Sequence, residues 1–168
     1  MRYIISSTWN GGALPSDEHV VFDVRANEGL SVAVDAPFHH DPPPPGPPGP
    51  WNGLWKHEVV ELFLVMENNR YLELELGPHG HYLVLLLEGR RQIAGTLPSI
   101  DYTARITGNR WKGVARIPRY HRPVSPVRGN AYAMHGKGED RTHLALFPLG
   151  GVTPDFHRLE DFRPIRLR

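Results

Sequence analysis

The sequence predicts an all-β protein, an antiparallel β-sandwich of roughly eight to ten strands with a jelly-roll-like arrangement. Two observations lead to this prediction. Apolar residues recur at every second position over many short segments, and clusters of turn residues separate these segments. No segment has apolar residues at the spacing of three and four that an amphipathic helix requires. We therefore expect little helix.

The expected strands follow one another along the chain with short connections. In residues 19–25, Val20, Phe22 and Val24 share one face, and the turn-like residues 26–29 lead into a second strand, which indicates a hairpin. The dipeptide Gly-Asn at 108–109 indicates another hairpin. The expected strands are residues 19–25, 30–36, 58–66, 71–77, 81–87, 101–107, 110–118, 130–136 and 143–149.

Composition limits the classes of function. The chain has 168 residues with 19 basic and 18 acidic side chains, so its formal charge of +1 does not favour nucleic acid or an anionic membrane as a partner. It has no cysteine, which excludes disulfides and Cys-ligated zinc. The start of the sequence lacks the apolar stretch of a signal peptide. We expect a single cytoplasmic domain over residues 1–168, with a small molecule as partner and an oligomeric state that the sequence does not indicate.

Seven prolines fall between residues 42 and 50. Such a run lacks backbone donors and favours an extended conformation. It could be a ligand for a proline-recognising domain, or a stiff loop between strands that forms the rim of a pocket. Because apolar strands lie on both sides and the run is not repeated, we favour a loop at residues 41–50.

Acidic residues interrupt two apolar strands. Tyr71, Glu73 and Glu75 share one face of their strand and leucines fill the other, so the acidic face is either solvated or lines a cleft. Glu58 and Glu61 lie three residues apart, which places them on opposite faces of a strand that is apolar on both sides. We expect Glu61 to be buried and paired, and Glu58 to lie at a solvent-exposed rim.

The order of motifs resembles that of the family-nine carbohydrate-binding modules. Trp55 precedes a strand that starts with Glu58 and Glu61, the next strand ends in LELGPHG, and RWKGVARIP is a Trp-led strand that ends in Ile-Pro. The resemblance covers roughly residues 51–138. More closely, DPPPPGPPGPWNGLWKHEVVELF, GPHGHYLVLLLEGRR, MHGKG and PDFHRLEDF resemble an uncharacterised family found in animals and bacteria. That family has no assigned activity and is related to the same β-sandwich superfamily, which includes the DOMON domains.

The resemblance implies a sandwich fold and suggests where a sugar could bind. Family-nine modules hold a terminal sugar between aromatic faces, because the C–H side of a pyranose packs on an indole while carboxylates accept hydroxyl protons. The second stacking Trp of that family has no counterpart here, and Phe156 and His157 are the candidates to replace it. We expect Trp9 and Trp111 to belong to the core. The candidate ligand-binding residues are Trp51, Trp55, Glu58, Glu73, His79, Arg90, His135 and His157.

Two hypotheses of different class remain. The first is non-catalytic binding of a small polar ligand, with a carbohydrate favoured. The second is a small enzyme that acts on a sugar-like metabolite with a His–Glu pair as acid and base. The absence of a G-x-S-x-G motif and of compact metal-ligand spacings favours binding, so we assign no catalytic residues, no metal and no cofactor. Arg90 and Arg91 follow a strand and could clamp an anion or pair with Glu61, Glu73 or Glu75.

Overall fold

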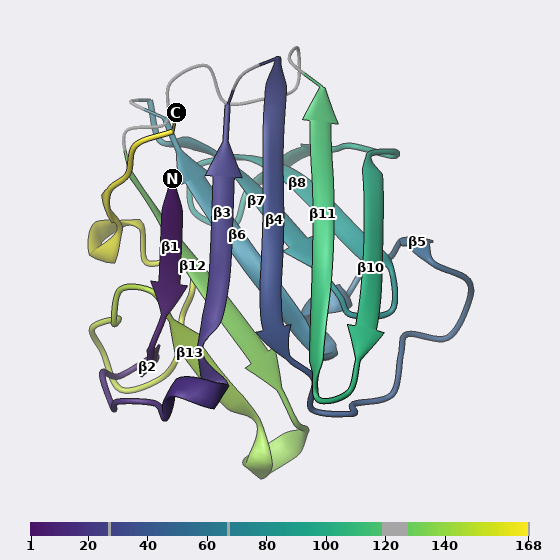
Figure 1. The fold of residues 1–168 in the computed structure, drawn as a ribbon. Coiled ribbons are helices and arrows are strands. Elements are labelled where there is room, and N and C mark those ends of the chain that lie inside the picture. The colour runs from purple at the N-terminus through teal and green to yellow at the C-terminus, as the bar shows by residue number, and fades with distance from the viewer. Residues whose placement is uncertain (27, 67, 119–127, 168) are drawn as a thin grey trace.

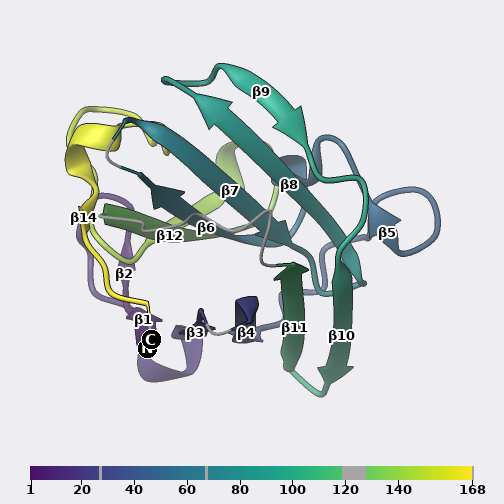
Figure 2. The same cartoon turned by 90° about the horizontal axis from the view of Figure 1, so that it is seen from above.

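Two β-sheets pack face to face in the computed structural model, which describes residues 1–26, 28–66, 68–118 and 128–167. The five-stranded sheet has the order β1-β3-β4-β11-β10. The nine-stranded sheet has the order β2-β13-β12-β6-β7-β8-β5, with β14 paired to β12 and β9 paired to β8. Figure 1 shows the five-stranded sheet in front of the other, and Figure 2 shows the two sheets as separate layers. The predicted fold class, an all-β antiparallel sandwich, is confirmed.

The elements have the following bounds. The five-stranded sheet contains β1 (Arg2–Ile5), β3 (Val20–Arg25), β4 (Gly29–Pro37), β10 (Asp101–Thr107) and β11 (Arg110–Pro118). The nine-stranded sheet contains β2 (Ser7–Thr8), β5 (Gly49–Pro50), β6 (Val59–Val65), β7 (Arg70–Leu76), β8 (His81–Glu88), β9 (Ile93–Thr96), β12 (Arg128–His135), β13 (Thr142–Ala145) and β14 (Arg163–Pro164). Short 3-10 turns lie at η1 (Ser16–Glu18), η2 (Leu54–Lys56), η4 (Gly138–Asp140) and η5 (Leu159–Asp161).

All nine strands predicted from periodicity are present, and both predicted hairpins form, β3 with β4 and β10 with β11. The predicted number of strands is wrong, because the described residues contain fourteen. Three of the additional strands, β2, β5 and β14, have two residues each, which is too short for an alternating pattern to be recognised. Among the described residues, no helix is long and apolar enough to span a membrane.

The core between the sheets is built by the inward faces that periodicity indicates. Val20, Phe22 and Val24 of β3 are buried there and pack with Leu72, Leu74 and Leu76 of β7 in one apolar cluster. Trp111 is buried in this cluster, as predicted. Trp9 is only partly buried and packs against a different cluster.

That second apolar cluster covers the outer face of the nine-stranded sheet, the face turned away from the five-stranded sheet. Phe63, Tyr71 and Tyr132 are buried in it, although the sandwich core lies on the other side of their strands. The cover comes from Trp51, Phe156, Leu159 and Phe162, which belong to the Pro-rich segment and the C-terminal part of the chain. A central strand covered on both sides is largely apolar. β6 is buried at all of its seven positions, and Glu61 is its one charged residue.

Candidate functional site

A cavity of about 680 Å³ opens on this outer face of the nine-stranded sheet. Its floor is formed by side chains of β6, β7, β8 and β12 that point away from the sandwich core. Its walls come from η2, from residues 137–143 and from residues 154–157. The lining residues are Trp55, Lys56, Glu61, Glu73, Leu85, Leu87, Arg91, Ile93, Met134, Lys137, Gly138, Arg141, His143, Pro154, Phe156 and His157.

Strand pairing explains why acidic side chains meet at the floor. In the antiparallel pair of β6 and β7, Glu61 lies opposite Glu75, and Phe63 lies opposite Glu73. Residues directly opposite one another across a pair point to the same face. The three glutamates therefore lie together on the outer face, while the leucines of β7 face the core.

All three carboxylates are buried. Glu61, Glu73 and Glu75 are 2%, 4% and 0% exposed, and one oxygen from each lies within 4.8 Å of the others. One oxygen of Glu73 and both oxygens of Glu75 have no hydrogen-bond partner in the described structure. Loss of hydration raises the pKa of each carboxyl group, and raises that of Glu73 to about 7.

The prediction for Glu61 is partly confirmed. It is buried, as expected, but no hydrogen bond or ion pair to its side chain forms within the described residues. Burial and the charge of Glu73 raise its pKa, whereas the charge of Arg141 lowers it. This glutamate is therefore part of the cavity floor, not of a closed structural pair.

Two aromatic side chains, Trp55 and Phe156, form part of the cavity wall. Trp55 is the middle residue of η2 and leaves 40% of its surface exposed. Phe156 comes from the C-terminal segment and stacks on Tyr132, with ring centroids 3.9 Å apart and planes 2° from parallel. Tyr132 is fully buried in β12, so it supports Phe156 from below.

Arg141 fixes two of the walls to each other. Its guanidinium donates hydrogen bonds to the backbone oxygens of Gly136 (2.7 Å), Trp55 (2.6 Å) and His57 (2.9 Å). It thereby joins the turn after β12 to the segment that carries Trp55. The planar fork of an arginine suits several acceptors at once, which a lysine could not match.

His157 lies between Tyr71 and Glu73. Its Nδ1 is 2.8 Å from the Tyr71 hydroxyl oxygen, and its Nε2 is 3.9 Å from an oxygen of Glu73. Burial is the main cause that lowers the pKa of His157 to about 4, and the charge of Arg91 adds to it, so the ring is neutral at pH 7. The Tyr71 oxygen also accepts a hydrogen bond from the Arg91 backbone N–H (3.0 Å). This arrangement favours the tautomer in which the tyrosine hydroxyl donates to Nδ1 and the Nε2 proton faces Glu73.

The structure separates the predicted site residues into groups. Trp55, Glu73 and His157 line the cavity together. Arg90 lies next to it and pairs with Asp155, which also receives a hydrogen bond from Arg91 (2.9 Å). Neither arginine forms an ion pair with one of the three glutamates within the described residues.

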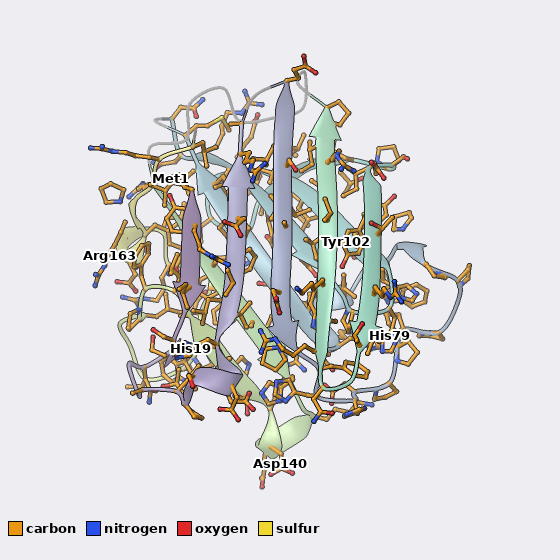
Figure 3. All side chains as sticks on the ribbon, in the orientation of Figure 1. Met1, His19, His79, Tyr102, Asp140 and Arg163 are labelled. Atoms are coloured by element: carbon orange, nitrogen blue, oxygen red, sulfur yellow. The ribbon has the colours of Figure 1, made fainter. Side chains whose placement is uncertain are left out.

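Trp51, Glu58 and His79 lie beside the Pro-rich loop instead. Trp51 makes an edge contact with the ring of His81, with centroids 6.1 Å apart. His79 approaches the backbone oxygen of Asp41 (3.3 Å), beside the loop (Figure 3). His57 and His81 approach the backbone oxygens of Pro42 and Gly46. A proline-rich segment keeps its carbonyls but lacks N–H donors, and these rings supply N–H groups to it.

The expectation that Glu58 lies at a solvent-exposed rim is wrong. Glu58 is 5% exposed and accepts hydrogen bonds from the backbone N–H groups of His39 (3.0 Å) and Asp41 (3.3 Å). The start of the Pro-rich loop folds back over it. Burial raises its pKa to about 7, although both hydrogen bonds act in the opposite direction.

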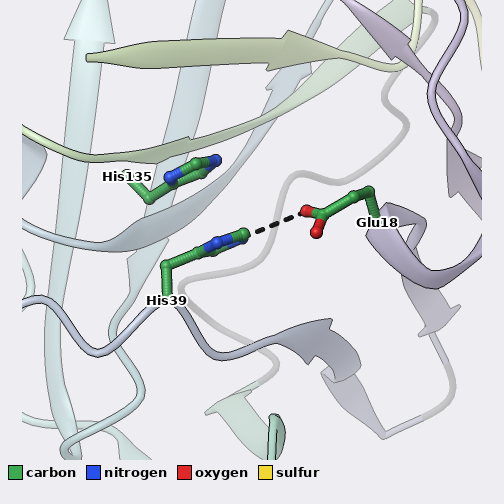
Figure 4. Close-up of side chains that lie close together, drawn as sticks. All are labelled: Glu18, His39 and His135. Atoms are coloured by element: carbon green, nitrogen blue, oxygen red, sulfur yellow. Dashed lines mark ion pairs between the residues drawn. The ribbon is translucent and has the colours of Figure 1, made fainter. Parts of the chain in front are cut away.

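His135 takes part in a third group, away from the cavity. Its ring stacks on that of His39 at a centroid distance of 3.5 Å and an interplanar angle of 6°. His39 in turn lies 3.4 Å from a carboxylate oxygen of Glu18 (Figure 4). Ring lone pairs lie in the ring plane, so those of two parallel stacked rings run side by side and do not converge on one ion. This stack is therefore poorly arranged for metal binding.

Several cavity residues are absent from the sequence prediction. Glu75 enters that prediction only as part of an acidic face and as a candidate partner of Arg90 and Arg91, and Arg141, His143 and Lys56 do not enter it. Arg141 lies in an irregular turn, where no periodicity indicates its direction. Phe156 was foreseen only as a replacement for a stacking tryptophan.

The fold has a counterpart of known structure. Over 96% of this chain and 84% of the other, it superposes with a TM-score of 0.73 and 16% identity on a protein described as a "putative carbohydrate-binding protein from Bacteroides uniformis ATCC 8492". At this identity the match shows a shared β-sandwich fold. No family model matches the chain.

Sequence relatives define the family. The "UPF0462 protein C4orf33 homolog" of Mus musculus is 39% identical over 98% of this chain and 90% of its own length, and that of Danio rerio is 40% identical over 100% and 90%. The Homo sapiens "UPF0462 protein C4orf33" is 38% identical over 97% and 86%. The chain therefore belongs to the UPF0462 family, which is uncharacterised.

Proposed function

We propose that this protein binds a carbohydrate, without changing it chemically, in the cavity on the outer face of the nine-stranded sheet. The observation that carries the proposal is the combination, in one cavity, of aromatic walls and a buried acidic floor. Trp55 and Phe156 offer ring faces, and Glu61 and Glu73 offer acceptors for hydroxyl protons. This is the combination that a pyranose requires, because one side of the ring is apolar and its edge is polar.

Size and rigidity support the proposal. A volume of about 680 Å³ lies within the range of small-molecule sites, roughly 300–1,000 Å³. Phe156 is stacked on the buried Tyr132, and the backbone of Trp55 is held by Arg141. Walls held in this way lose little conformational entropy when a ligand binds.

The comparisons add support at the level of fold. The Bacteroides uniformis protein with the same fold has a description that names carbohydrate binding. The sequence also resembles the family-nine carbohydrate-binding modules. By that resemblance, Trp55 of this chain would be one of the two residues that stack on the sugar. Phe156 would take the place of the second.

Titration calorimetry with a panel of mono- and disaccharides tests this function. We expect heat of binding with at least one saccharide, and a loss of affinity of about tenfold or more in Trp55→Ala, because one stacking surface is removed. Ile4→Ala is a matched control: Ile4 is an apolar side chain 45% exposed on β1 of the other sheet, and this variant should bind like the wild type. No heat with any saccharide would contradict the proposal.

One observation favours a second function, an enzyme that acts on the same class of molecule. The Nε2 atom of His157 lies 3.9 Å from Glu73, and the pKa of Glu73 is raised by burial to about 7, near the value that suits a general acid or base. Incubation of each binding saccharide with the protein, followed by NMR of the mixture, separates the two functions. New sugar resonances that disappear in Glu73→Gln would establish the enzyme.

A further inference from the structure

The floor of the cavity brings three buried carboxyl groups together in a way that the proposed saccharide site does not explain. Glu75 is fully buried, neither of its oxygens has a hydrogen-bond partner in the described structure, and it lies beneath the cavity with Glu61 and Glu73. Like charges directly opposite each other in a sheet are destabilising, and an unpaired buried carboxylate is more so. Either protonation of the carboxyl groups or a bound cation relieves such an arrangement.

The neighbouring basic groups do not supply a partner of opposite charge. The charge of Arg141 lowers the pKa of Glu61, but the N–H groups of the Arg141 guanidinium donate to three backbone oxygens. The charge of Arg91 lowers the pKa of Glu73, but Arg91 forms its ion pair with Asp155. His157 is held by Tyr71 and lies 3.9 Å from Glu73. No ion pair between a lysine or arginine and any of the three glutamates occurs in the part of the chain that the structure describes.

We propose that Glu61, Glu73 and Glu75 bind one hard divalent cation, with Ca²⁺ as the preferred ion. Carboxylate oxygens without nitrogen or sulfur donors are the ligand set of Ca²⁺, Mg²⁺ and Mn²⁺. Two oxygens on opposite sides of a Ca²⁺ ion are separated by about 4.6–5.2 Å. The glutamate oxygens all lie within 4.8 Å of one another, so a single Ca²⁺ ion can contact one oxygen from each. Mg²⁺ demands near-ideal octahedral geometry and loses its bound water reluctantly, so we expect it to bind more weakly than Ca²⁺.

The surroundings suit a calcium site. Calcium takes six to eight oxygen ligands and accepts irregular geometry, and Glu61 and Glu73 line the open cavity, from which water can complete the coordination. The ligands lie on two paired strands, β6 and β7, which fix their positions. The inference does not depend on saccharide binding, because the ion is held by the protein's own carboxylates.

Metal binding is tested on the chain after treatment with EDTA and removal of the chelator. We expect heat on titration with CaCl₂, and a rise in the thermal midpoint of about 5–10 °C at a hundredfold excess over Kd. Tb³⁺, a luminescent substitute for Ca²⁺, should show emission sensitised by Trp55, and Ca²⁺ should displace it. MgCl₂ should bind more weakly. The absence of both calcium heat and terbium emission would overturn the proposal.

Variants locate the ion. Glu75→Gln, which keeps the shape of the side chain, should lose the calcium-dependent shift in midpoint. Glu18→Gln is the matched control, because Glu18 belongs to the separate cluster with His39 and His135. A shift that persists in Glu75→Gln, or one that is lost in Glu18→Gln, would refute the assignment to these three glutamates.

A measurement on the wild-type protein covers the case in which a variant does not fold. Substoichiometric Mn²⁺ broadens the NMR signals of nearby backbone amides, and the broadening should centre on β6 and β7. Broadening centred on His39 and His135 would place the ion elsewhere and contradict the proposal. Saccharide titrations repeated in EDTA keep the two proposals separate, since sugar binding without the ion would leave the proposed function intact.

Discussion

Replacement of Arg141 by alanine should loosen the cavity wall and destabilise the whole protein. The guanidinium makes three hydrogen bonds to backbone oxygens, and two of them hold the segment that carries Trp55. A hydrogen bond that involves a charged group contributes about 1.5–3 kcal/mol. Because one of the three is at an exposed position, we count the other two at the lower end of this range, about 1.5 kcal/mol each, and the exposed one at about 0–1 kcal/mol, which gives a total loss of about 3–4 kcal/mol.

Urea unfolding followed by tryptophan fluorescence measures this loss. With an m-value of about 2 kcal/mol/M for a chain of this size, the midpoint should fall by about 1.5–2 M. Arg141→Lys keeps the charge but cannot reach three acceptors with one ammonium group, so it should recover less than half of the loss. Arg105→Ala, at an exposed position in β10, should change the midpoint little. An Arg141→Ala protein that unfolds at the wild-type midpoint would show that the three hydrogen bonds contribute nothing net.

Two further predictions concern the packing of the sheets and the Pro-rich loop. Gly129→Ala should destabilise by several kcal/mol or prevent folding, because the new Cβ would lie 2.4 Å from a backbone oxygen of β6. Gly95→Ala, whose Cβ would meet nothing within 4 Å, should be almost neutral, and equal urea midpoints would contradict the reasoning. Glu58→Ala leaves the N–H groups of His39 and Asp41 unpaired and should cost about 1–3 kcal/mol, with faster hydrogen exchange at both amides. Unchanged exchange would show that water or other groups replace the carboxylate.

The alternation of apolar residues predicted the strands of both sheets, because it depends only on which face of each strand is buried. The alternation of Val20, Phe22 and Val24 requires only that one face be buried, and the structure buries that face. The outer face of the nine-stranded sheet was harder to predict. Its cover comes from residues 154–162, which are far along the chain from β6 and β7 and show no periodicity of their own.

The exchange of roles between Glu58 and Glu61 illustrates the same limit. Both lie in the predicted strand 58–66, Glu58 at its start and Glu61 within it, and the sequence does not show which one will find donors. Glu58 is satisfied because the loop after β4 folds over it, whereas Glu61 faces a cavity. Both outcomes depend on segments brought close only by the tertiary structure.

The sequence predicted a residue of the candidate site only where the direction of its side chain follows from its position in or beside a strand. Glu73 follows from the alternation of β7, and Trp55 from its place just before a strand. His79 and His135 both lie where a strand ends in a glycine turn, and Asp41 contacts both turns, through its backbone oxygen at His79 and through its carboxylate at the Gly136 N–H. The two histidine rings nevertheless take different partners. One holds the Pro-rich loop and the other stacks on His39. The sequence indicated which strands end in polar residues and not which strand ends are neighbours.

Chemical-shift mapping with a saccharide is the most direct test of the cavity as a ligand site. A ¹H–¹⁵N spectrum of the wild-type protein is recorded with increasing amounts of each sugar in the panel. We predict that the shifts for a binding sugar concentrate on the indole N–H of Trp55 and on the backbone amides of Phe156 and His157, with little change in β1, β3 and β4 of the opposite sheet. Shifts centred on the opposite sheet, or none with any saccharide, would contradict the account.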